Sequence, residues 1–162
     1  MALSYRIEFH MRDPRHDIQF TVREPVWQKI ADIFDKSDEC EPRSCIVIRT
    51  VDGMCVAINL AEVQAVSHLS DAVIAPPDNS VYDDAIQIQL KGRERPFEER
   101  TEDDVSLADL IMALERGPDI VPVVRLLDED GEMLRVKAAE IVYVIAPAVQ
   151  VDAGYRAIEN DE

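Results

Sequence analysis

A strand-turn-strand pattern occurs twice in the chain and limits the folds that it can adopt. Residues 49–66 read RTVDGMCVAINLAEVQAV, and residues 125–144 read RLLDEDGEMLRVKAAEIVYV. Each stretch has an Asp-Gly pair, at 52–53 and at 130–131, and an Ala-Glu pair further on. An Asp-Gly pair between apolar runs favours a β-hairpin, because glycine tolerates the positive φ of a tight turn. The sequence therefore predicts two related hairpins.

The first hairpin is expected to turn through two residues. A type I′ turn at 52–53 sets Arg49 opposite Val56. Both faces of this hairpin are apolar, which favours a central position in a sheet. The matched positions give the second hairpin two extra residues in its turn, and Pro122 in its first strand indicates an edge or a bulge.

A second match within the chain places these hairpins in larger units. Residues 5–37 and residues 85–117 each read as an alternating strand, a turn, a strand and an amphipathic helix. The second helix is expected to begin with a capping box of Thr101 and Asp104 and to end at Gly117. The predicted fold class is α+β: internally duplicated β-β-α-β-β-β units whose antiparallel hairpins form small-barrel-like sheets with two amphipathic helices.

The duplication sets the predicted domain boundaries. Residues 1–69 are the first repeat and residues 85–147 the second. The two are expected to pack as one pseudo-twofold domain, because a unit of this size buries little apolar surface alone. Residues 70–84 have the Pro-Pro-Asp-Asn-Ser composition of an exposed linker loop. Residues 148–162 are predicted to be a mobile, acidic C-terminal tail.

The charge of the chain restricts its partners. Its 162 residues include 33 acidic and 17 basic side chains, a net charge of −16. Such a surface repels phosphate backbones, so nucleic-acid binding is disfavoured. The chain has no apolar run long enough for a membrane helix, and its N-terminus lacks the pattern of a signal peptide. We therefore expect a cytoplasmic protein that binds no membrane.

The sequence gives no reason to expect catalysis or a cofactor. The segment HMRDPRHD holds side chains that can ligate a first-row metal, but their spacing fits no known ligand motif and a polar turn explains them better: His10, Asp13, His16 and Asp17. No phosphate-binding glycine loop or nucleophile elbow occurs. With no Cys-x-x-Cys pair, the cysteines are expected to be reduced, and Cys45 and Cys55 to be packed. We expect a protein that is not an enzyme, with no catalytic residue, metal or cofactor.

The order of these patterns resembles the short flagellar FlbD-type proteins. The resemblance lies in the hairpin IVIRTVDGMCVAINLAEVQAV, the segment AIQIQLKGRERPFEE and the acidic-led helix DDVSLADLIMAL. The matching positions are turn and packing residues: Asp52, Gly53, Asn59, Leu60, Glu62, Val63 and Gly92. A hairpin with a helix is also similar to Sm-like small barrels. The resemblance implies a strand-rich module that assembles, and for Sm-like proteins RNA binding through loops, for which this chain has no basic loop.

Acidic segments flank both predicted helices and are the candidate interaction surface. They are DKSDECE at 35–41 and EERTEDDVSLAD at 98–109. Rows of carboxylates on a rigid domain imitate nucleic-acid phosphates; the alternative is a solubilising surface that also favours the dipole of the second helix. The only tryptophan is either an interface anchor or part of the core. The candidate interaction residues are Trp27, Asp35, Asp38, Glu39, Glu41, Glu98, Glu99, Glu102, Asp103 and Asp104.

Three functions remain open on the sequence. The first is a non-enzymatic module that binds another protein or assembles, with edge strands that allow a homo-oligomer. The second is an acidic inhibitor that mimics nucleic acid and blocks a nucleic-acid-binding enzyme, as mobile elements use against defence systems. The third is an Sm-like RNA-binding protein.

Overall fold

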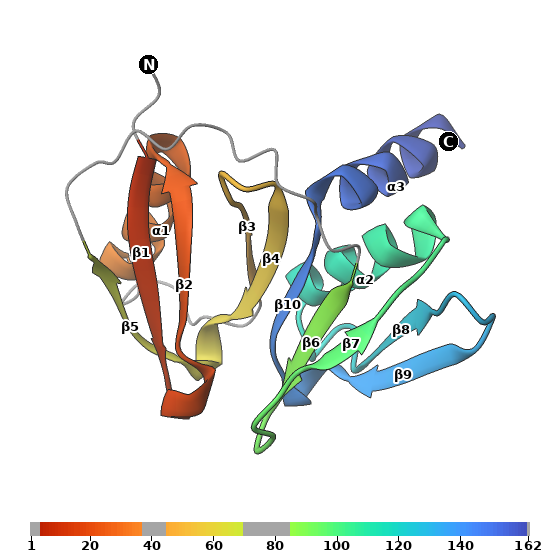
Figure 1. The fold of residues 1–162 in the computed structure, drawn as a ribbon, viewed down its shortest axis with the longest axis horizontal. Coiled ribbons are helices and arrows are strands. Elements are labelled where there is room, and N and C mark those ends of the chain that lie inside the picture. The colour runs from red at the N-terminus through yellow and green to blue at the C-terminus, as the bar shows by residue number, and fades with distance from the viewer. Residues whose placement is uncertain (1–3, 37–44, 70–84, 162) are drawn as a thin grey trace.

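The computed structural model describes residues 4–36, 45–69 and 85–161. They form the predicted α+β fold, with helices and antiparallel strands (Figure 1). The predicted linker loop at 70–84 lies outside the described residues. No helix in the described ranges is long and apolar enough to span a membrane.

The two halves of the chain have the same order of strands and α-helices, and the first half has an additional short helix, η1. The first half comprises β1 (Ser4–Met11), η1 (Pro14–His16), β2 (Ile18–Arg23), α1 (Glu24–Asp35), β3 (Cys45–Arg49), β4 (Met54–Asn59), η2 (Leu60–Glu62) and β5 (Val63–His68). The second comprises β6 (Ile86–Leu90), β7 (Phe97–Glu99), α2 (Asp104–Arg116), β8 (Val123–Leu127), β9 (Met133–Lys137), η3 (Ala138–Glu140) and β10 (Ile141–Pro147). A further helix, α3 (Ala148–Asn160), ends the described chain.

Strand pairing also follows one scheme in both halves. β1 lies between β2 and β5, as β6 lies between β7 and β10, and β3 pairs with β4 as β8 pairs with β9. The internal duplication itself stays a prediction. One contact departs from this scheme. β4 also pairs with β10, whereas its counterpart in the second half, β9, pairs only with β8 among the described strands.

The β4–β10 contact builds a five-stranded sheet in the order β3-β4-β10-β6-β7, beside a β2-β1-β5 sheet and a β8-β9 hairpin. In the described pairings each of these sheets is open, with two edge strands, rather than closed into a barrel. The predicted central position of the first hairpin holds for β4, whereas β3 is an edge strand. The strand after Pro122 is β8, in a hairpin whose two strands are both edges, as expected.

Two apolar cores lie on opposite faces of the five-stranded sheet. One contains α2, α3, β6 and the β8–β9 hairpin, with Leu107 and Val151 fully buried. The other contains β1, β2 and α1, with Phe9 and Ile30 fully buried. β4 and β10 contribute to both cores because successive side chains on a strand face opposite ways. The alternating members of β10 are Val144 and Ala146 in the first core, and Tyr143 and Ile145 in the second.

The first hairpin is shifted by one residue from the predicted register. Arg49 pairs with Cys55, one residue before the predicted partner. The backbone N–H of Thr50 donates to the carbonyl of Met54 at 2.9 Å, so three residues form the loop instead of two. The last of them, Gly53, has a φ of 87°. A turn that ends in a glycine at positive φ is the usual three-residue hairpin loop, which explains the shift.

The second hairpin has a loop of the same length. Asp128 donates its backbone N–H to the carbonyl of Glu132 at 2.8 Å, and Gly131 has a φ of 81°. The predicted two-residue insertion in this turn is therefore wrong. The strand position equivalent to Arg49 is Leu127, which pairs with Met133.

The helix α2 is capped by Asp103, not by the predicted box. The Asp103 carboxylate accepts the backbone N–H of Ser106 at 3.0 Å. The Thr101 hydroxyl instead accepts the backbone N–H of Asp103 at 3.0 Å, so the predicted pairing with Asp104 is wrong. The helix ends at Gly117 with a φ of 91°, as expected.

The predicted mobile tail is wrong over 148–160, which form the helix α3. This helix packs against α2, with Val151 fully buried. The two helices approach closely at Gly154, where an added Cβ would lie 2.0 Å from the carbonyl oxygen of Asp104 and 2.7 Å from the Cβ of Ala108. Only a residue without a side chain fits this contact.

Candidate functional site

The structure groups the second acidic segment with the turn between β8 and β9. The backbone N–H of Glu129 donates to the carbonyl of Arg100 at 2.9 Å, so the turn lies against the end of β7. Carboxylates of the turn then surround the last residue of β7. We call these five residues the acidic turn cluster: Glu99, Asp128, Glu129, Asp130 and Glu132.

The electrostatics of this cluster are unfavourable to negative charge. Burial raises the pKa of Glu99, and the four turn carboxylates raise it further. Every charge that shifts this pKa is another carboxylate. A cation placed among these groups would therefore be attracted by all of them.

The backbone of the turn is well fixed. One carboxylate oxygen of Asp128 accepts the backbone N–H of Asp130 at 2.9 Å and that of Glu132 at 2.8 Å. The side chains of Glu129, Asp130 and Glu132 are exposed, so an ordered loop presents them to solvent.

The other predicted residues of this segment have mixed roles. Glu98 and Glu102 are exposed, while Asp104 is half-buried in the first turn of α2. Glu98 precedes Glu99 on β7, so the two side chains face opposite ways. Asp103 caps α2, which supports the helix-dipole alternative for this residue.

Asp35 is the one candidate of the first acidic segment that the structure describes, and it lies apart from the second segment. Asp35 is exposed at the end of α1, and α1 and the β8–β9 hairpin lie towards opposite ends of the molecule (Figure 1). The remaining candidates of this segment lie outside the described residues: Asp38, Glu39 and Glu41.

Trp27 is part of the edge of a core, and its role as an interface anchor stays a prediction. It is half-buried and packs against the core beneath β1. Its ring stacks on Tyr5, with centroids 6.4 Å apart, and lies 5.8 Å from His68. The rings of Tyr5 and His68 are 5.2 Å apart, so the three rings contact one another.

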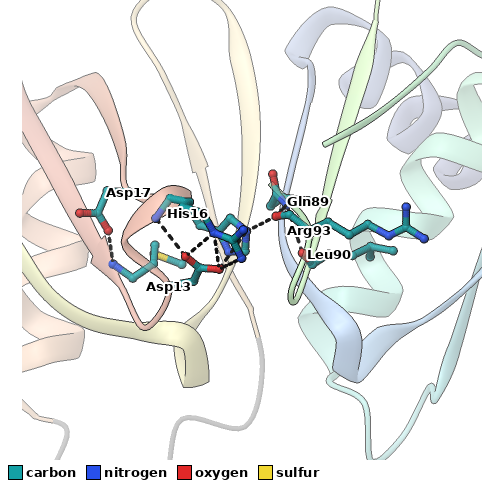
Figure 2. A network of polar contacts seen from close by, with 8 residues as sticks. Asp13, His16, Asp17, Gln89, Leu90 and Arg93 are labelled. Atoms are coloured by element: carbon teal, nitrogen blue, oxygen red, sulfur yellow. Dashed lines mark hydrogen bonds and ion pairs between the residues drawn. The ribbon is translucent and has the colours of Figure 1, made fainter. Parts of the chain in front are cut away.

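A buried histidine connects the two halves of the chain (Figure 2). His16 in η1 is 3% exposed, and its Nε2 lies 2.5 Å from the carbonyl oxygen of Arg93, in the β6–β7 turn. Gln89, 1% exposed, donates to the same carbonyl at 2.8 Å. Hydrogen bonds from Arg15 hold the pKa of Asp13 at about 2, and the Asp13 carboxylate lies 3.7 Å from His16. This network supports the turn interpretation for Asp13 and His16.

The two described cysteines are packed thiols, as predicted. Burial raises the pKa of Cys45 to about 12 and that of Cys55 to about 11. Thiols with such pKa values are poor nucleophiles at neutral pH. The guanidinium of Arg49 donates to the Cys55 sulfur at 2.8 Å and to the carboxylate of Asp152 at 2.9 Å. Arg49 thereby ties β3 to α3.

A third group of side chains lies on the outer face of the β2-β1-β5 sheet. His10 and Asp17, which the sequence singled out, lie beside Glu8, which it did not. One ligand atom from each residue lies within 4.8 Å of the other two. Glu8 could have been recognised as a third candidate ligand from its spacing to His10, because residues two apart on a strand share a face.

No protein-family model, curated protein or solved structure matches this chain. The resemblance to FlbD-type and Sm-like proteins stays a prediction. Functional proposals for this protein therefore rest on the chemistry of its own side chains.

Proposed function

We propose that this protein is a non-enzymatic interaction module that binds a basic surface of another protein through the acidic turn cluster. The observation that carries this proposal is the group of turn carboxylates held beside the end of β7, which together with burial raise the pKa of Glu99. A lysine or arginine of a partner would relieve their repulsion and gain from their combined field.

The fixed turn supports the same proposal. The Asp128 carboxylate and the contact with Arg100 hold the loop before any partner arrives. Binding by a preorganised loop costs less conformational entropy than binding by a flexible segment. The proposal places the protein in the cytoplasm, where packed thiols such as Cys45 and Cys55 stay reduced.

Mimicry of nucleic acid is a narrower form of this proposal. Its support is the net charge of −16 together with a cluster of carboxylates on one turn. In that case the partner is an enzyme whose basic groove holds DNA or RNA, and duplex DNA competes with this protein for the groove. The same charge weighs against direct RNA binding of the Sm-like kind.

Affinity capture with a matched pair of variants tests the proposal. The first variant neutralises the cluster by Glu99→Gln, Glu129→Gln, Asp130→Asn and Glu132→Gln, and leaves Asp128 because its carboxylate holds the turn. The control also removes four carboxylate charges, all of them exposed and elsewhere on the protein, by Asp109→Asn, Asp119→Asn, Glu140→Gln and Glu159→Gln. Each immobilised protein is exposed to cell lysate and eluted with salt, and retained proteins are identified by mass spectrometry.

We expect a stoichiometric basic partner on the wild-type protein and on the control. The cluster variant should bind this partner about tenfold more weakly or worse, because several exposed ion pairs of about 0.2–1 kcal/mol each are lost. Equal retention by the cluster variant would contradict the proposal, and equal loss in both variants would indicate non-specific charge attraction. Displacement of the partner by duplex DNA identifies the mimic; retention in its presence points to an ordinary protein interface.

A further inference from the structure

We propose that Glu8, His10 and Asp17 form a binding site for a first-row divalent cation on the outer face of the β2-β1-β5 sheet. Their carboxylate and imidazole ligand atoms lie within 4.8 Å of one another. This site is separate from the acidic turn cluster, which lies on the other half of the chain.

Strand geometry explains why the three side chains meet. On β1 the residues Ile7 and Phe9 point into the core, so Glu8 and His10 point outwards. β2 is antiparallel to β1, with Phe9 opposite Ile18. Asp17 immediately precedes β2 and therefore lies next to His10.

A hydrogen bond to Ser67 restrains the imidazole of His10. Its Nε2 lies 2.9 Å from the hydroxyl oxygen of Ser67 on β5. With Nε2–H donating to Ser67, the lone pair of Nδ1 faces the carboxylate of Asp17. Metal-binding histidines usually donate their second N–H in this way, which fixes both the tautomer and the ring.

The carboxylate of Asp17 is oriented as well. One of its oxygens accepts the backbone N–H of Met11 at 2.7 Å. The other lies 3.8 Å from Nδ1 of His10, too far for a hydrogen bond. Two ligands of one tetrahedral zinc ion are about 3.4 Å apart, so a shift of a few tenths of an ångström brings this pair to metal-binding geometry.

The third ligand, Glu8, is less restrained, and the nearby arginines are engaged elsewhere. Among the described residues, a carboxylate oxygen of Glu8 has one long contact, of 3.4 Å to the side-chain amide nitrogen of Gln19. Arg6 donates to that same amide group at 2.9 Å, and Arg12 donates to the carbonyl of Ala61 at 2.7 Å. Glu8 is thus available to complete the set.

The ligand types indicate which ions fit. One imidazole nitrogen with two carboxylate oxygens suits zinc, manganese or ferrous iron better than magnesium or calcium, which prefer oxygen alone. Three protein ligands leave at least one position for water. We choose zinc as the probe, with cobalt as its spectroscopic substitute.

Calorimetric titration of the intact protein with Zn²⁺ tests the site. We expect saturable binding of one equivalent, at least tenfold weaker in His10→Ala and in Asp17→Asn. Asp17→Asn retains the side-chain oxygen that accepts the Met11 N–H. This variant therefore still tests the site if His10→Ala does not fold. Ser67→Ala keeps all three ligands but frees the imidazole, and should weaken binding about 10-fold or more.

Two controls separate this site from other zinc ligands. His68→Ala removes another exposed imidazole, and the four-residue variant of the acidic turn cluster removes four of its five carboxylates; both should bind zinc as the wild type does. With Co²⁺, visible absorption without a thiolate charge-transfer band is expected from nitrogen and oxygen ligands. Absence of binding to the wild type, binding unchanged in His10→Ala and Asp17→Asn, or a thiolate band would each overturn the proposal.

Discussion

The pKa of Glu99 depends on the charges around its side chain. Burial and four nearby carboxylates raise its pKa above the ordinary value of 4.5. A raised pKa means that the folded state binds the proton more tightly than the unfolded state does. The contribution of Glu99 to the free energy of unfolding is therefore present below about pH 4.5 and is lost as the pH rises through the folded-state pKa.

Replacing this residue should stabilise the protein at neutral pH. Glu99→Gln removes a charge from the repulsive group, so we expect the free energy of unfolding to rise by about 0.5 kcal/mol, a value limited by solvent screening. The gain should vanish in acid, where the native glutamate is protonated. Urea unfolding at neutral and acidic pH measures both.

The matched control is Glu98→Gln, on the opposite face of β7, which should give a smaller gain at neutral pH. If Glu99→Gln destabilises the protein at neutral pH, or stabilises it equally at both pH values, the electrostatic account of this residue is wrong.

Individual side chains could be predicted from the sequence only where local pattern places them. Gly117 ends α2 at positive φ, as expected from the Gly-Pro pair that follows the helix pattern. The carboxylates around Glu99 and the contact of His16 with Arg93 join segments far apart along the chain. Such contacts depend on how elements pack, which no local pattern of residues records.

At the level of elements, types were easier to predict than lengths and registers. The Asp-Gly pairs correctly indicated hairpins, but the same pair fits a two-residue loop and a three-residue loop. Hydrogen bonds between Thr50 and Met54 stabilise the three-residue loop. The helix α3 was not predicted, because the acidic composition of this segment favoured a mobile tail. Its apolar residues Val151, Tyr155 and Ile158 are nevertheless spaced as one helix face.

The contact between α2 and α3 gives a prediction opposite to helix propensity. Alanine favours a helix over glycine by about 1 kcal/mol, so propensity alone predicts that Gly154→Ala stabilises α3. We expect the reverse, a loss of about 1–3 kcal/mol, because the new methyl group would lie 2.0 Å from the Asp104 carbonyl oxygen. Thermal or urea unfolding measures the change.

The neighbouring position provides the comparison. Ala153→Gly alters propensity without adding an atom and should cost about 1 kcal/mol. A gain in stability in Gly154→Ala would show that the two helices separate freely at this point.

For the whole molecule, the central sheet makes the two halves interdependent. β10 belongs to the second half of the chain but supplies Val142, Tyr143 and Ile145 to the core of the first. In return, β4 supplies Cys55 and Ala57 to the core of the second. His16 adds a buried polar contact across the same division.

Neither half should therefore fold alone. We expect separate peptides covering residues 1–69 and 85–162 to lack cooperative unfolding, and an equimolar mixture to regain it. Circular dichroism of each peptide and of the mixture measures this. A cooperative transition in the isolated first peptide would show that its core closes without β10; the intact chain is the reference.

The position of β10 also affects how the protein is made. Both cores need this strand, which follows all the other described strands along the chain. At about 5–20 residues per second, the ribosome needs about 7–30 s to add residues 1–147. Until β10 has been made, the nascent chain exposes the strands of both unfinished cores, so neither core closes before that point and the need for chaperones is greatest just before it.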